Sequence, residues 1–317
     1  MLMVDKKINF GLIGVGYLGK FHLTHLKNIK NVSMIGVYDA DKKHSSQISK
    51  DYGVQNYKTL DDLLCNVDAV SIVTPTNTHM DIALKALAYN CHIFIEKPIS
   101  NTMRSVKNFL GQIKTKNKVI HVGHIERFNP AFNSFMQNSH APLFLECHRL
   151  TKINNRSMDV SVILDLMIHD IDLVLNLVDS PINNIIADGI CVVSDKVDLA
   201  NVKLIFKNGC VANLTASRIS NKDMRKIRVF EHQVYTNIDL LNKSLNQYSA
   251  KYDKKREKFR FNNQKIAVKQ YDALKMELTY FCNAIIKKDT NLNNVSKAVQ
   301  ALEVSEKINT IINNKLK

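Results

Sequence analysis

No uninterrupted apolar run in this chain of 317 residues reaches the roughly 18 residues that a bilayer-spanning helix requires. Residues 1–9 also lack the apolar segment of a secretory leader. These two absences exclude the usual routes into or across a membrane. We therefore expect a cytoplasmic protein without membrane insertion.

Cysteine is scarce, and its spacing excludes the usual disulfide and zinc patterns. The six cysteines are widely separated, no two form a C-x-x-C pair, and most have apolar neighbours, so we expect reduced residues in the core. Six histidines have no ligand spacing with cysteine or with one another, and we interpret them as structural or surface residues: His22, His25, His44, His121, His140 and His148. The sequence therefore predicts no metal site.

The chain carries a formal net charge of +15 but has no arm rich in lysine and arginine. Its basic residues are spread along the whole length, and the densest run, 251–260, contains two acids and is typical of a solvated surface segment. Proteins that bind nucleic acid usually gather positive charge into a patch or tail. The distribution therefore favours a small polyanionic ligand over nucleic acid.

The length exceeds what one hydrophobic core usually supports, so we expect two domains, 1–124 and 125–317, with C-terminal helices that can pack back on the first. In the first domain, short runs rich in valine and isoleucine alternate with segments of helical period. The expected strands are 8–13, 33–38, 69–73, 92–95 and 119–122, and the expected helices are 18–30, 42–52, 60–65, 80–89 and 103–116. This order predicts an α/β fold with the doubly wound parallel sheet of a Rossmann domain.

The pattern changes to period two after about residue 124. The expected strands there are 143–150, 185–193, 197–206, 210–217, 227–230 and 234–240, and the expected helices are 162–178, 274–287 and 295–313. Asn208-Gly209, between two of these strands, is a strong signal for a two-residue hairpin. We therefore expect an α+β domain with an open, mostly antiparallel sheet, which can leave one face for a partner subunit.

A glycine-rich loop joins the first expected strand to the first helix. Its sequence, Gly14-Val15-Gly16-Tyr17-Leu18-Gly19, matches the G-x-G-x-x-G pattern in the context that a dinucleotide site requires. The glycines permit a tight turn and close approach of a pyrophosphate to the helix N-terminus. The alternative is a glycine turn that binds nothing.

Asp39 ends the second expected strand, 20 residues after Gly19. An acid at this place can accept hydrogen bonds from the hydroxyls of an adenosine ribose and would repel a 2′-phosphate, so it favours NAD over NADP. Lys42 and Lys43 could soften that preference. Alternatively, Asp39 is an ordinary cap of the next helix.

Two motifs follow the third and fourth of these expected strands, at the sheet edge where ligands of open α/β sheets bind. They are Thr74-Pro75-Thr76-Asn77-Thr78-His79 and Glu96-Lys97-Pro98. Desolvation and the positive charge of a nicotinamide should push the pKa of Lys97 down, so that it can hydrogen-bond a substrate hydroxyl and help move its proton. The residues that we expect to contact the cofactor at this edge are Thr74, Pro75, Asn77, His79, Glu96 and Lys97.

The expected helix 162–178 carries Asp165 and His169, four residues apart and therefore on one face. The carboxylate can orient the imidazole while the imidazole takes a proton from a carbinol. A pair at this spacing is more often found on an exposed helix face, but the flanking residues here are mostly apolar. We expect a catalytic pair.

In this order and at these intervals, the four motifs resemble the Gfo/Idh/MocA family of oxidoreductases over essentially the whole chain. The resemblance implies a nicotinamide cofactor, oxidation or reduction of a sugar or cyclitol carbinol, and assembly through the open sheet as a homodimer or homotetramer. By motif position, Lys97 matches the family's active-site lysine, Asp165 its helix aspartate and His169 its general acid/base. One departure is 161–164, Ser-Val-Ile-Leu, where many members have a glycine-rich lead-in.

The segments 122–130 and 164–170 resemble the branch of the family that contains UDP-N-acetylglucosamine 3-dehydrogenases. That resemblance implies oxidation of the sugar 3-hydroxyl and a ketone that passes to a pyridoxal-phosphate aminotransferase, for lipid A or related glycans. Arg127 could then bind a phosphate or a sugar oxygen, or instead form a salt bridge with Glu126 or another acid.

Two other functions fit the same motifs. One is a dehydrogenase of a free sugar, inositol or sugar acid, and the other is a dinucleotide-binding protein without catalysis. The presence of Lys97, Asp165 and His169 argues against the second, because a binding protein needs none of them. The catalytic interpretation requires Lys97 and His169, from separate domains, to reach one alcohol oxygen beside the nicotinamide.

Overall fold

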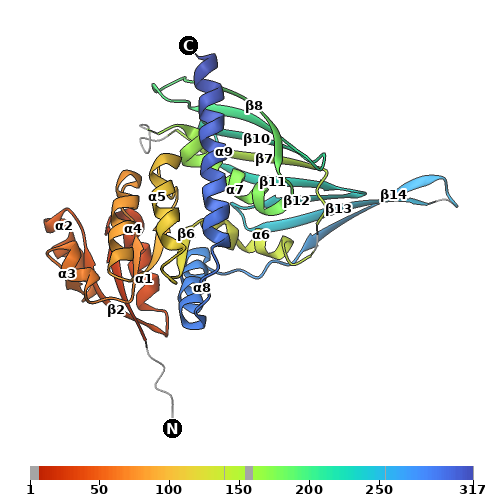
Figure 1. The fold of residues 1–317 in the computed structure, drawn as a ribbon. Helices are drawn as coiled ribbons and strands as arrows, with labels where there is room; N and C mark the ends of the chain where they lie inside the picture. The colour runs from red at the N-terminus through yellow and green to blue at the C-terminus, as the bar shows by residue number, and fades with distance from the viewer. Residues whose placement is uncertain (1–6, 139, 154–159, 254, 317) are drawn as a thin grey trace, which may run out of the picture. The chain divides into compact units, whose positions relative to one another are not determined.

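The computed structural model describes residues 7–138, 140–153, 160–253 and 255–316. The chain divides into two compact units (Figure 1): Met1–Ile125 with Asp272–Val299 form the first unit, and Glu126–Tyr271 with Gln300–Lys317 form the second. Within the described part of the chain, no helix combines the length and apolarity needed to cross a membrane.

The first unit is built on a six-stranded parallel sheet with strand order β3-β2-β1-β4-β5-β6. Its strands are β1 (Ile8–Ile13), β2 (Val32–Tyr38), β3 (Gln55–Asn56), β4 (Ala69–Ile72), β5 (His92–Glu96) and β6 (Ile120–Gly123). The helices between them are α1 (Tyr17–Lys27), α2 (Lys42–Tyr52), α3 (Leu60–Leu64), α4 (His79–Ala88) and α5 (Met103–Ile113). The predicted Rossmann sheet is confirmed, and only the two-residue strand β3 was not predicted.

Helix α8 (Ala273–Lys287) joins this unit from far along the sequence. Its Phe281 packs edge-on against Phe10 of β1 and Phe94 of β5, with ring centroids 6.1 and 5.7 Å apart. The carboxylate of its Glu277 lies 3.0 Å from the imidazole of His121, and both side chains are buried. Burial of this aromatic and polar face fixes the helix on the sheet.

The second unit is built on an eight-stranded sheet with order β14-β13-β12-β11-β7-β10-β9-β8. All its neighbouring strands are antiparallel except β7 and β10. The strands are β7 (Phe144–Lys152), β8 (Ile182–Ile190), β9 (Leu199–Phe206), β10 (Val211–Ser220), β11 (Met224–Glu231), β12 (Val234–Asp239), β13 (Ser244–Asp253) and β14 (Lys258–Ile266). This architecture confirms the predicted open, mostly antiparallel sheet.

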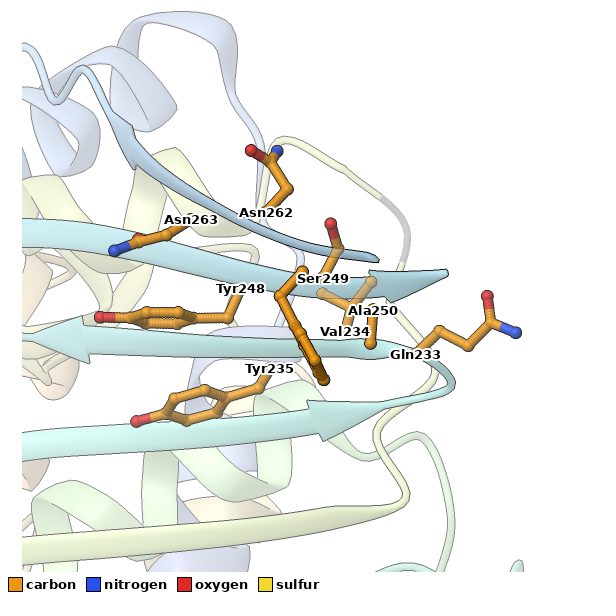
Figure 2. Close-up of a pocket in the computed structure, with 9 residues that line it drawn as sticks. Gln233, Val234, Tyr235, Tyr248, Ser249, Ala250, Asn262 and Asn263 are labelled. Atoms are coloured by element: carbon orange, nitrogen blue, oxygen red, sulfur yellow. The ribbon is translucent and has the colours of Figure 1, made fainter. Parts of the chain in front are cut away.

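Helices cover one face of this sheet and leave a row of aromatic rings on the other. The core of the unit includes residues of α6 (Pro130–Phe135), α7 (Ile168–Leu177) and the part of α9 (Asn293–Lys315) that follows Val299. On the opposite face, Phe230, Tyr235 and Tyr248 are cross-strand partners, and their rings stack with centroids 4.9 and 5.2 Å apart. Figure 2 shows the two tyrosines side by side on β12 and β13.

Three details differ from the sequence-based expectations. The predicted surface segment 251–260 is exposed where described except at the half-buried Asp253, but it belongs to the hairpin of β13 and β14, two strands that were not predicted. The hairpin at Asn208-Gly209 has a three-residue loop rather than two, with Gly209 at φ +89°, because Phe206 N–H donates to Cys210 O. Cys65 and Cys191 are exposed, so the expectation that all cysteines lie in the core is wrong for these two.

Candidate active site

The glycine loop connects β1 to α1 and requires glycine at two positions for different reasons. Gly14 has φ +91°, and a Cβ there would lie 2.4 Å from Val73 O. A Cβ at Gly19 would lie 2.2 Å from Gly14 O, so only glycine lets the helix approach the turn this closely.

Gly16 has the opposite surroundings, because a Cβ there would meet no atom within 4 Å. It is the N-cap of α1, so the helix begins at Tyr17, directly after the open side of the loop. Backbone N–H groups at a helix N-terminus are a ready site for phosphate oxygens. The loop therefore fits a pyrophosphate.

Asp39 lies at the end of β2 beside this loop. Its Oδ2 accepts a hydrogen bond from Val15 N–H at 2.8 Å, and its Oδ1 accepts one from Asp41 N–H at 2.9 Å. The cap of α2 is Asp41, whose side chain accepts from Lys43 and His44 N–H. The alternative that Asp39 caps the helix is therefore wrong, and its carboxylate instead fixes the shape of the glycine loop.

Lys42 is held next to Asp39 by two contacts. Its ammonium donates to the carbonyl oxygen of Asp39 at 3.0 Å and lies 4.0 Å above the ring of Tyr38. The ammonium of Lys42 therefore contacts the Asp39 backbone and the Tyr38 ring. Its positive charge stays close to the carboxylate of Asp39, where a ribose would bind.

Replacing Asp39 with alanine should weaken NAD binding about 10- to 100-fold, because both the acceptor for the loop and the acceptor for the ribose are lost. Isothermal titration calorimetry with NAD measures the change. Asp41→Ala is the matched control, since it removes a neighbouring carboxylate that caps α2 and touches no loop residue. Equal NAD affinities for the two variants would contradict this role of Asp39.

The turn after β4 and the lysine after β5 are tied together by His79. Its Nε2 lies 2.9 Å from Thr74 O and its Nδ1 lies 3.0 Å from Pro98 O. The ring is 1% exposed, and burial lowers the pKa of His79. This geometry places His79 between the two loops, and its contact with the cofactor remains a prediction.

Lys97 follows β5 and is half-buried. Its backbone N–H donates to Oε2 of Glu96 at 3.2 Å, and the peptide bond between Lys97 and Pro98 is cis. The Glu96 side chain is buried, and its carboxylate also contacts His22 inside the unit. Thr74 joins this edge through a hydrogen bond from the Thr78 hydroxyl at 2.7 Å, whereas Pro75 and Asn77 are exposed.

Asp165 and His169 lie in the second unit, at the start of the predicted helix. Asp165 belongs to a π-helical turn, Ile163–Met167, and His169 to the first turn of α7. Such turns are often found at functional sites. Both side chains are half-buried, which differs from the exposed pair that the alternative interpretation requires.

A buried ion cluster that the sequence analysis missed anchors α7. Arg149 of β7 is 2% exposed and donates to Asp170, the residue after His169, at 2.8 to 3.1 Å. It also donates to Glu126 at 2.9 Å. Burial alone would raise the pKa of Glu126, but the charge of Arg149 and its hydrogen bond hold that pKa below its usual range.

The same helix is held by Arg127, whose Nε donates to Oδ2 of Asp172 at 2.7 Å. A second bond joins Nη2 of Arg127 to Oδ1 of Asp172. The alternative of a salt bridge is therefore what the structure has, with Asp172 rather than Glu126 as the partner. Its contact with a phosphate or a sugar oxygen remains a prediction.

The cluster had a signal in the sequence. Residues 145, 147 and 149 of β7 alternate as buried positions, so an arginine at 149 lies where the pattern expects an apolar side chain. A buried arginine requires acidic partners, and Asp170 and Asp172 stand among apolar residues of α7. No group of three or more His, Cys, Asp or Glu side chains among the described residues is arranged to hold a metal ion.

The structure therefore brings the glycine loop, Asp39, the Thr74 turn and Lys97 together in the first unit, and places Asp165, His169 and Arg127 in the second. A parallel sheet with a G-x-G-x-x-G loop after its first strand, an acid after its second and a lysine at its carboxyl edge is typical of dinucleotide-dependent oxidoreductases. Two family models match the chain. The model of the Gfo/Idh/MocA oxidoreductase family, NAD-binding Rossmann fold, matches residues 8–124, and the model of the GFO/IDH/MocA C-terminal domain matches residues 117–233.

The chain belongs to the Gfo/Idh/MocA family and is an oxidoreductase acting on CH–OH groups. It is 36% identical to UDP-N-acetylglucosamine 3-dehydrogenase from Acidithiobacillus ferrooxidans over 87% of this chain and 88% of the relative. It is 26% identical to a myo-inositol 2-dehydrogenase from Thermotoga maritima over 67% of this chain and 69% of that one. A solved structure of the Acidithiobacillus enzyme superposes with a TM-score of 0.91 at 32% identity, over 98% of this chain and 99% of the other.

Proposed function

We propose that this protein oxidises the 3-hydroxyl of UDP-N-acetylglucosamine to a ketone with NAD⁺. The observation that carries the proposal is the 36% identity to a relative with that named activity, which the match covers over 88% of the relative's length. The motif residues Lys97, Asp165 and His169 are all present in the chain.

The first unit binds the dinucleotide in this proposal. The N–H groups at the start of α1 hold the pyrophosphate, and Asp39 accepts hydrogen bonds from the adenosine ribose. Asp39 also favours NAD over NADP, because its carboxylate would repel a 2′-phosphate. When bound, NAD⁺ supplies the hydride acceptor.

Lys97 and His169 perform the proton chemistry. His169 would accept the hydroxyl proton of the carbinol, and bound NAD⁺ would supply the acceptor for the hydride from C3, so that the products would be the ketone and NADH. Lys97 donates a hydrogen bond to the oxygen and stabilises the negative charge that develops there, while Asp165 orients the imidazole. The ion cluster of Arg149 and Asp170 holds the helix turn that carries His169.

We further propose a cytoplasmic enzyme that works as a homodimer or homotetramer. The stacked rings of Phe230, Tyr235 and Tyr248 on the open sheet face support assembly through that face, because apolar rings there would leave water on contact with a second copy. In this proposal the ketone is the substrate of a pyridoxal-phosphate aminotransferase, in the synthesis of lipid A or a related surface glycan.

A substrate panel tests the proposal. NADH formation, followed by absorbance at the reduced nicotinamide, is measured with UDP-N-acetylglucosamine, free N-acetylglucosamine and myo-inositol. We expect kcat/KM to be about 100-fold or more higher for the nucleotide sugar, because binding of its remote diphosphate contributes to catalysis. Activity that survives removal of UDP would instead favour a dehydrogenase of a free sugar or inositol, the activity named for the Thermotoga relative.

A further inference from the structure

His22 lies inside the first unit, on the helix that follows the glycine loop. It is 0% exposed and contacts two other elements of the sheet. Its Nδ1 lies 2.9 Å from the hydroxyl oxygen of Ser71 on β4, and its Nε2 lies 3.0 Å from Oε1 of Glu96 on β5. One imidazole thus joins α1, β4 and β5 beneath the edge where the site residues lie.

The partners decide the direction of these hydrogen bonds. A carboxylate oxygen can only accept, so Nε2 of His22 carries the proton that it donates to Glu96. In the neutral ring, Nδ1 accepts a hydrogen bond from the Ser71 hydroxyl. Each nitrogen has a distinct role, and the two roles can be removed separately.

The carboxylate of Glu96 contacts both His22 and the backbone of Lys97. Its other oxygen, Oε2, accepts a hydrogen bond from the backbone N–H of Lys97 at 3.2 Å. The carboxylate lies against β6, because a Cβ at Gly123 would lie 2.9 Å from its Oε1, and Glu96 is buried. A shift of His22 would therefore move Glu96, and with it the backbone that carries Lys97.

The contact of His79 with Pro98 O restrains the other side of Lys97. His79 belongs to α4 and binds Thr74 O, and so it does not depend on His22. Lys97 is thus flanked by two buried histidines, and only His22 comes from the helix that begins at the phosphate loop.

We propose that His22 is a positioning residue that sets the backbone of Lys97 through Glu96, and so links the phosphate-binding helix to the lysine of the reaction. The inference rests on the proposed function, in which Lys97 touches the reacting oxygen. Loss of the contact between His22 and Glu96 lowers kcat, because small displacements of a reacting group cost rate, whereas NAD binding at the loop and ribose acid is retained.

Two substitutions separate the two nitrogens of the ring. In His22→Gln the side-chain amide takes the place of Nε2 and can still donate to Glu96, whereas in His22→Asn the amide takes the place of Nδ1 and cannot. We measure kcat, KM, NAD affinity and thermal stability for both, together with the rate of hydrogen exchange at the Lys97 backbone amide. Ser71→Ala is the matched control for the Nδ1 contact.

We expect His22→Asn to lower kcat about 10- to 100-fold with little change in KM, and to speed exchange at the Lys97 amide. His22→Gln and Ser71→Ala should stay within about threefold of the wild type in both measurements. Equal effects of the Gln and Asn variants, or a loss of turnover that follows thermal stability alone, would overturn the proposal. If the wild type oxidised no sugar nucleotide but the exchange difference persisted, the proposed function would fail while the positioning of Lys97 by His22 would stand.

Discussion

Lys97→Met is expected to lower kcat by about 10² to 10⁴ and to leave NAD affinity unchanged within about threefold. Methionine retains the apolar stem of the side chain but cannot donate a hydrogen bond to the substrate oxygen. In the proposed function the pyrophosphate and the adenosine ribose bind at the glycine loop and Asp39, which the substitution does not touch. Steady-state kinetics and NAD titration calorimetry on the same preparation measure both quantities.

Lys107→Met is the control for this experiment, because Lys107 is an exposed residue of α5 and its loss changes the net charge equally. We expect wild-type turnover from it. Retained turnover in Lys97→Met, or a loss of NAD affinity in proportion to the loss of turnover, would be incompatible with a lysine that acts on the substrate oxygen.

Arg149→Met should destabilise the protein by about 3 to 5 kcal/mol, because Asp170 and Glu126 lose their buried cation and Glu126 is left with a 3.7 Å ion pair to Arg225, whose side chain is 43% exposed. Urea unfolding measures the loss. Arg228→Met is the matched control on the next strand: Arg228 pairs with Glu146 at 2.9 Å, but its side chain is 45% exposed, so we expect about 1 kcal/mol or less. Similar losses for the two variants would show that the buried cluster does not stabilise the second unit.

The pH dependence of this loss follows from Glu126. In the wild type Arg149 lowers the pKa of Glu126, so its contribution to stability is present above the unfolded pKa and is lost as the pH falls through the folded value. Without Arg149, the raising effect of burial on the pKa of Glu126 is opposed mainly by the more exposed Arg225, 3.7 Å away, so the carboxylate is less stable at neutral pH. The difference between wild type and variant should therefore shrink as the pH is lowered from 7 toward 5, and a constant difference would contradict this origin.

The sequence could predict most of the first unit because its strands are buried and apolar. β1 is buried at nearly every position, and α2 begins after a capping aspartate and ends before Gly53 in the left-handed conformation, so both have clear limits. The strands β13 and β14 had no such pattern. β14 is exposed at eight of its nine positions, and its pairing with β13 therefore left no alternation of apolar residues to read.

The motif residues could be predicted, but their contacts could not. Glu96 and His79 stand in recognisable motifs, yet both side chains are buried: Glu96 contacts His22, 74 residues away, and His79 contacts Pro98, 19 residues away. Arg127 had an acid beside it in the chain and pairs instead with Asp172 on α7. Spacing along one element predicts a shared face, whereas pairing across elements depends on packing that the sequence pattern does not contain.

Transfer of an isotopic label tests the central claim most directly. The enzyme is incubated with NAD⁺ and with UDP-N-acetylglucosamine that carries deuterium only at C3 of the sugar. The reduced cofactor is then isolated, and its mass is measured by mass spectrometry. The account predicts that the deuterium appears in the reduced cofactor and that the sugar becomes a 3-ketone. Reduced cofactor without deuterium, or a sugar that keeps its label through turnover, would contradict hydride transfer from C3.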